Sequence, residues 1–161
     1  MKAMSMVLCI AVFGMVAGLV HAYFRGRNRL KAKALKALQN AYKVPAGSVH
    51  RSVFTYDGRP IKKQPKGKQF RVLVLKGERT MTSVHTGTSW TDDCCLSFEG
   101  ERIGFLGEGI YHDLLSSLVN KYGSASIVVH IKGYDANAGF PYVVADLPEL
   151  DWFHSALRKQ Q

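Results

Sequence analysis

The segment Cys95-Leu96-Ser97-Phe98-Glu99-Gly100-Glu101-Arg102-Ile103-Gly104-Phe105-Leu106 decides the fold class of this chain. Two short apolar runs flank a Glu-Gly-Glu centre, a pattern typical of a tight β-hairpin. From Ile110 the apolar residues recur every three or four positions, and Gly123 follows as a stop signal. That spacing predicts a helix directly after the hairpin. The segment therefore indicates a mixed α+β domain.

Further strand signals lie on both sides of this hairpin and helix. Alternating or apolar runs predict strands at residues 49–56, 70–75, 126–131 and 142–145, and a terminal helix at residues 147–157. Such a set of short strands around one well-supported helix indicates a small β-rich domain with helices packed against it.

The N-terminus carries a different signal. The run Ala3 to Phe24 contains no charged residue, and a helix of that length would be about 33 Å long against a hydrocarbon core of roughly 30 Å. Basic residues follow it directly: Arg25, Arg27, Arg29, Lys31, Lys33 and Lys36. Because positive charge stays on the cytoplasmic side, we predict a single-pass protein of the cell membrane, with its N-terminus outside and its C-terminal domain in the cytoplasm.

Two further readings of the N-terminus stay open. Small residues up to Ala22 also fit a secretory signal peptide cleaved before Tyr23, which would release a secreted domain. Gly14, Gly18 and Ala22 fall on one helix face. Small residues on such a face let two helices approach closely, so a homodimer formed through this face is one expected assembly.

Charge divides the chain into parts. Residues 1–47 hold eight basic and no acidic residues, whereas residues 80–161 hold five basic and ten acidic ones, within a net charge of +10. We divide the chain into an anchor (1–24), a basic amphipathic juxtamembrane helix and linker (25–47) and a soluble β-rich domain (48–161). The six basic residues after the anchor are expected to contact anionic lipid.

One loop carries the ligand signal. Residues 59–68 read RPIKKQPKGK, and such a proline- and lysine-rich stretch predicts an exposed segment able to neutralise phosphates. The predicted nucleic-acid-binding residues are Arg59, Lys62, Lys63, Lys66, Lys68, Trp90 and Asp92. No histidine or cysteine pair has the spacing of a zinc site, and no nucleophile has a local catalytic signature, so we expect no metal, no cofactor and no catalytic residue.

The segment Thr91 to Leu106, with the helix from Ile110 and the strand at 127–131, resembles the core of HIRAN domains across residues 70–146. The resemblance implies a small, modified β-barrel that binds the 3′ end of single-stranded DNA. In the loop where the family carries an Asn-Pro-Tyr-Asp-like run, this chain has Ser89-Trp90-Thr91-Asp92, so only the aspartate matches.

Together these observations predict an α+β fold, a β-rich, modified barrel-like domain with one or two packed helices behind a transmembrane helix. The expected function is that of a membrane-anchored, non-enzymatic binding module for nucleic acid, single-stranded DNA in particular. The alternative functions are a structural component of a membrane protein complex and the secreted domain described above.

Overall fold

The structure of the protein is a computed structural model. It describes residues 2–55, 60–77, 80–82, 89–91, 94–134 and 140–159, and of residues 2–17, 80–82 and 89–91 it describes the backbone alone.

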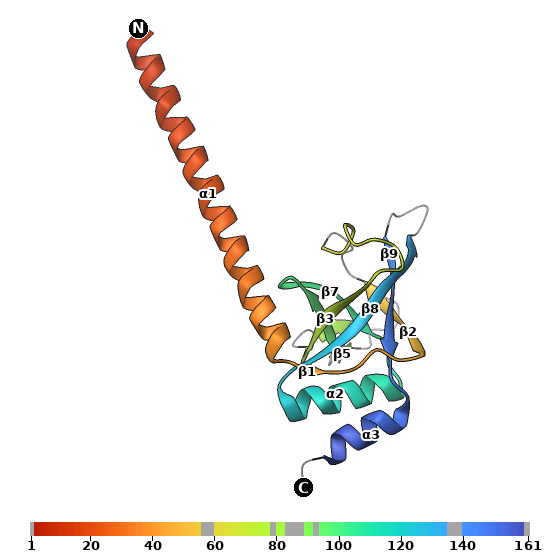
Figure 1. Ribbon diagram of the computed structural model, residues 1–161. Helices are drawn as coiled ribbons and strands as arrows, with labels where there is room; N and C mark the ends of the chain where they lie inside the picture. The colour runs from red at the N-terminus through yellow and green to blue at the C-terminus, as the bar shows by residue number, and fades with distance from the viewer. Residues whose placement is uncertain are drawn as a thin grey trace.

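A closed antiparallel β-barrel forms the body of the described chain (Figure 1). Its strands are β2 (Val49–Thr55), β3 (Gln69–Leu75), β6 (Cys95–Phe98), β7 (Glu101–Leu106), β8 (Ala125–Tyr134) and β9 (Pro141–Leu147). They follow one another around the barrel in the order β8, β3, β6, β7, β2, β9, and the pairing of β9 with β8 closes the ring. Alternate residues of each strand fill the interior, as Val143, Ala145 and Leu147 do along β9.

The predicted hairpin is confirmed as the pair β6–β7. Its turn residues Glu99 and Gly100 have φ values of 51° and 88°, the left-handed backbone that favours glycine. Gly104 serves a different need, because a Cβ there would lie 2.1 Å from the carbonyl oxygen of Phe54. A glycine is thus required where β7 passes β2.

Two helices lie at one end of the barrel. The predicted helix is confirmed as α2 (Ile110–Tyr122), which buries Tyr111, Leu115 and other apolar residues against the strands and stops at Gly123. The terminal helix α3 (Leu150–Arg158) packs on α2, with the rings of Tyr111 and Phe153 5.8 Å apart. Figure 1 shows both helices below the strands.

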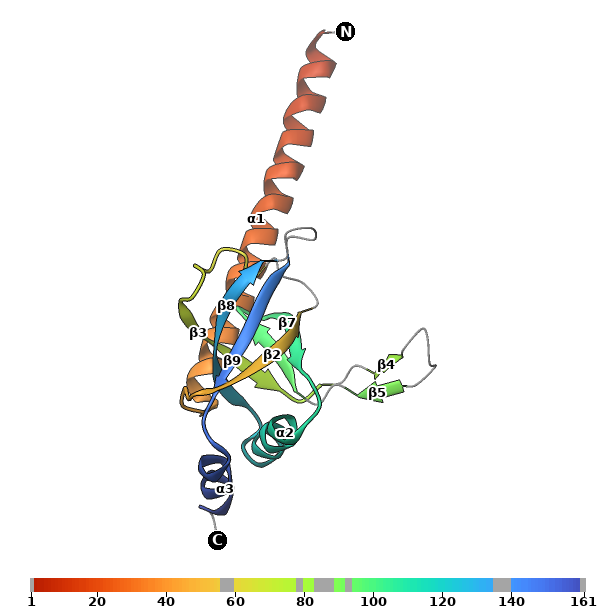
Figure 2. The same ribbon diagram turned by 90° about the vertical axis from the view of Figure 1, so that its right-hand side faces the viewer.

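The N-terminal helix α1 (Lys2–Asn40) leaves the barrel as a long rod (Figures 1 and 2). Its last turns contact the barrel: Lys31 pairs with Glu99 at 2.5 Å, and a Cβ on Gly100 would lie 3.5 Å from that of Ala34. After α1, strand β1 (Tyr42–Lys43) pairs in parallel with β8. The ring of Tyr42 stacks on Tyr122 at 4.1 Å, and burial, with Tyr122 beside it, raises the pKa of Tyr42.

The transmembrane helix predicted for residues 3–24 is not supported. In the part of the chain that the structure describes, no helix is long and apolar enough to cross a membrane. We therefore correct the predictions of a transmembrane helix, of single-pass topology and of a cell-membrane location with a cytoplasmic domain.

The predicted fold class is wrong as well. The described chain is a closed antiparallel barrel with three helices, rather than a modified barrel-like domain with one or two helices behind a membrane span. The physical reason lies in contacts between distant residues. Ring closure depends on β9 pairing with both β8 and β2, and the last part of α1 packs on the barrel.

The remaining strands, β4 (Thr80–Thr82) and β5 (Ser89–Thr91), pair with each other in a separate two-stranded sheet. Figure 2 shows this hairpin projecting away from the barrel.

Candidate functional site

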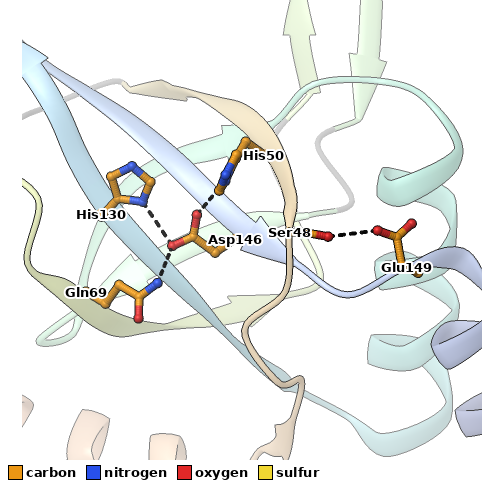
Figure 3. Close-up of polar contacts among 6 residues, drawn as sticks. All are labelled: Ser48, His50, Gln69, His130, Asp146 and Glu149. Atoms are coloured by element: carbon orange, nitrogen blue, oxygen red, sulfur yellow. Dashed lines mark hydrogen bonds and ion pairs between the residues drawn. The ribbon is translucent and has the colours of Figure 1, made fainter.

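A buried carboxylate on the outer face of the barrel organises a cluster of polar side chains. Asp146 lies on β9 with a side chain only 1% exposed, and three side chains from other strands surround it. Nδ1 of His50 lies 2.8 Å from Oδ1, Nδ1 of His130 lies 2.9 Å from Oδ2, and Nε2 of Gln69 donates to Oδ2 at 2.9 Å. Figure 3 shows the three side chains converging on the carboxylate.

Strand register explains why these residues meet. His50 of β2 stands directly opposite Asp146, and Gln69 of β3 stands directly opposite His130 of β8. Directly paired residues point to the same side of a sheet. Asp146 alternates with Ala145 and Leu147, which are buried in the barrel, so the whole cluster points outward. The surrounding side chains, rather than the core, shield the carboxylate from water.

The hydrogen bonds fix how each imidazole is held. An ionised carboxylate only accepts hydrogen bonds, so both Nδ1 atoms carry the donating proton. In each ring Nε2 is then the remaining nitrogen, and among the described residues neither Nε2 has a hydrogen-bond partner. The side chain of His50 is 62% exposed and that of His130 is 21% exposed. Two oriented imidazoles therefore face the solvent beside each other, with ring centroids 6.0 Å apart.

The same outer face carries a hollow of about 440 Å³ next to the histidines. Its lining includes Ser52 of β2, Lys132 and Gly133 of β8, and Tyr142 and Val144 of β9. Val144 stands directly opposite His130, so the hollow borders the histidine cluster. A Cβ on Gly133 would lie 4.0 Å from the ring of Tyr142, which places that ring over the glycine.

Aromatic rings are exposed on the same outer face: Tyr142 lines the hollow, and Phe54 lies beyond its lining on β2. Phe54 follows Ser52 two positions along β2, is 57% exposed, and stacks on Phe105 of β7 with centroids 5.2 Å apart. Tyr142 is also 57% exposed. Neighbouring exposed rings that form a patch are typical of an interaction surface.

A lysine-rich loop lies beside the same strands. Residues 60–68 lead into β3, and the backbone N–H of Gly67 donates to the carbonyl of Ile131 at 2.9 Å. The hydroxyl of Tyr134 also donates to the carbonyls of Lys62 and Gln64, at 3.3 and 3.4 Å. We call the aromatic–lysine face the outer surface with the hollow and Phe54, together with the loop lysines at the adjoining end of β8. Its loop lysines are Lys62, Lys63, Lys66 and Lys68, all exposed.

The other residues predicted to bind nucleic acid are not brought to this face. Arg59 and Asp92 lie outside the described residues. Trp90 belongs to β5, of which only the backbone is described. In Figure 2 the β4–β5 hairpin projects from the opposite side of the barrel to the lysine loop. The structure thus gathers the four lysines and separates them from Trp90.

Among the side chains that the structure describes, the residues predicted for the N-terminal helix do not gather into one site. Gly18 and Ala22 are exposed, and Gly14 lies where only the backbone is described. Lys31 forms the ion pair with Glu99 already described, and the other predicted lipid-contacting residues are exposed on α1: Arg25, Arg27, Arg29, Lys33 and Lys36.

Two other hollows are less suited to a charged ligand. One, of about 280 Å³, separates α1 from the β6–β7 hairpin and is lined largely by apolar residues such as Leu38 and Phe98. The other, of about 340 Å³, lies between β2 and the start of α2, and its lining includes His50, Phe54 and the acidic Glu108. No group of three or more histidine, cysteine or acidic residues in the described chain could hold a metal ion.

No protein-family model, curated protein or solved structure matches this chain. Two descriptions predicted from the sequence are therefore corrected. No homologue or family supports the description as a DNA-binding protein, and no helix in the described chain supports the description as a transmembrane protein.

Sequence reasoning missed the Asp146 cluster. One signal was present, because His130 alternates with Val129 and Ile131 and therefore faces outward from its strand. Nothing in the sequence indicated that His50 and Asp146, which are 96 residues apart, stand opposite each other.

Proposed function

We propose that this protein is a binding module for single-stranded nucleic acid, which lies along the aromatic–lysine face. The observation that carries the proposal is that exposed rings and loop lysines occur on neighbouring parts of the barrel: Tyr142 and Lys132 line one hollow, and Tyr134 of the same strand as Lys132 holds the lysine loop. Proteins that bind single strands combine rings that stack on bases with cations that follow the phosphates.

The charge of the face supports an anionic ligand. The outer sides of β2, β8 and β9 and the loop 60–68 contain one acidic residue, Asp146. That carboxylate is buried and shielded by two histidines and a glutamine. A phosphate chain would therefore meet lysines with no exposed carboxylate in the described part of this surface, although residues 80–161 are acidic as a whole.

The resemblance to HIRAN domains supports the same proposal, because that family is expected to bind single-stranded DNA with a small barrel. The proposal does not depend on the family's loop, of which only Asp92 matches. Stacking and phosphate neutralisation are common to both kinds of nucleic acid, so single-stranded RNA and DNA are both suitable probes.

Replacing the exposed rings tests the proposal. We expect Phe54→Ala and Tyr142→Ala each to weaken binding of a fluorescent oligonucleotide of about 12 nucleotides by roughly tenfold, since stacking contributes about 1–3 kcal/mol per base. Fluorescence anisotropy at low salt gives the dissociation constants.

Tyr23→Ala is the matched control, because Tyr23 is a similarly exposed ring on α1, away from the barrel. It should bind as the unaltered protein does. Absence of binding at low salt, where phosphate contacts are strongest, would refute the proposed function.

A further inference from the structure

We infer that His50 and His130 form a metal-independent acid–base pair that cleaves single-stranded RNA bound on the aromatic–lysine face. The inference rests on the proposed function for substrate binding. It goes beyond that function, and beyond the expectation of a non-enzymatic protein, by assigning chemistry to the Asp146 cluster.

The geometry of the cluster orients both imidazoles. One buried carboxylate holds both imidazoles through Nδ1, at 2.8 and 2.9 Å, and each Nε2 is left without a partner among the described residues. An imidazole held in this way has a fixed tautomer and a fixed direction for its second nitrogen. A carboxylate with a purely structural role also needs hydrogen-bond donors, but any donor would serve. Two of the three donors here are imidazoles, the side chain suited to proton transfer near neutral pH.

The surroundings supply the other requirement, a place for a phosphodiester. The hollow that borders the cluster contains Lys132 and Ser52, and the exposed ring of Tyr142 lies within the same lining. Tyr142 lies two residues from Val144, the strand partner of His130, so a base stacked on that ring would lie on the face that carries the histidines. A lysine ammonium beside the reacting phosphate would stabilise the charge that develops on its oxygens.

The reaction needs no metal, cofactor or redox partner. The 2′-oxygen of the ribose attacks the adjacent phosphorus, and the new P–O2′ bond forms as the P–O5′ bond breaks. One imidazole, entering neutral, accepts the 2′-hydroxyl proton at Nε2, and the other, entering protonated, donates its Nε2 proton to the leaving 5′-oxygen. The products are a 2′,3′-cyclic phosphate and a 5′-hydroxyl. Proton exchange with water restores the two imidazoles.

The test uses an oligodeoxynucleotide that contains a single ribonucleotide, incubated with the full chain in EDTA. We expect one cut after the ribonucleotide, with a 2′,3′-cyclic phosphate end identified by mass spectrometry. The all-deoxy oligonucleotide should bind and remain intact, because it lacks the attacking hydroxyl. Binding is measured separately by anisotropy on this uncleavable strand.

The variants His50→Asn and His130→Asn are chosen to keep the fold. The amide nitrogen of asparagine occupies a place close to that of Nδ1 and can still donate to Asp146, whereas the group at Nε2 is lost. Each variant should slow cleavage at least 100-fold, the scale of acid–base catalysis, and leave all-deoxy binding within about threefold. The control is His154→Asn on the exposed side of α3, which should cleave normally.

The outcomes separate the two proposals. Binding without cleavage would refute the acid–base pair and leave the binding function standing. Cleavage that persists in the His50→Asn/His130→Asn double variant would come from another nuclease and would refute it too. Absence of binding would refute the proposed function, and the inference that rests on it.

Discussion

Replacing Asp146 with alanine is expected to lower the free energy of unfolding by about 3 kcal/mol. The carboxylate accepts hydrogen bonds from His50, Gln69 and His130 and so links β9 to β2, β3 and β8. Removing it leaves three donors without their acceptor around a newly opened space, and a bond to a charged group contributes more than a neutral one. Denaturant unfolding should show the loss as a lower midpoint, and thermal unfolding as a fall of roughly 10 °C.

The matched control for this prediction is Glu149→Gln. Glu149 accepts a hydrogen bond from Ser48 at 2.8 Å, but the pair is exposed, so the change should stay within about 0.5 kcal/mol. Asp146→Asn should fall between the two, since the amide keeps the volume and one accepting oxygen. A loss for Asp146→Ala no larger than for Glu149→Gln would show that the cluster does not hold the four strands together.

Replacing the four loop lysines with glutamine is expected to weaken single-strand binding by roughly 100- to 1,000-fold in about 0.1 M salt. Each lysine that neutralises one phosphate contributes about 0.7 to the slope of log K against log salt concentration on a single strand. Loss of all four should therefore reduce the slope by about 3. Anisotropy titrations at several salt concentrations measure both quantities. The substituted residues are Lys62, Lys63, Lys66 and Lys68.

A variant of α1 with the same loss of charge controls for net charge. Four exposed basic residues of the helix are changed to glutamine: Arg25, Arg27, Lys33 and Lys36. If binding is confined to the aromatic–lysine face, this variant should keep most of its affinity and nearly the full salt slope. Equal losses in the two variants would show that net charge attracts the strand and that the face has no special part in binding.

Local pattern was sufficient for several elements of this fold. The glycine turn predicted the β6–β7 hairpin, because Gly100 readily takes the left-handed backbone that the turn requires. Apolar spacing predicted α2, and Gly123 predicted its end. In each case the residues that interact are close in the sequence, so their order alone carries the information.

The N-terminal helix shows where local pattern misleads. An uncharged run followed by basic residues predicted a membrane span, yet α1 continues past those residues to Asn40 and its last turns pack on the barrel. Lys31, assigned from the sequence to a lipid surface, pairs with Glu99 of the hairpin turn. Helix periodicity does not reveal which partner a helix will contact.

By itself the sequence determined the hairpin, the central helix and the exposed lysine loop, since neighbouring residues set their backbone geometry and exposure. Only the tertiary structure decided that the barrel closes and that His50, His130 and Asp146 meet on its surface. The reason is strand register. A shift of one residue would turn each of these side chains to the opposite face, and register is set by pairing between strands that lie far apart in the chain.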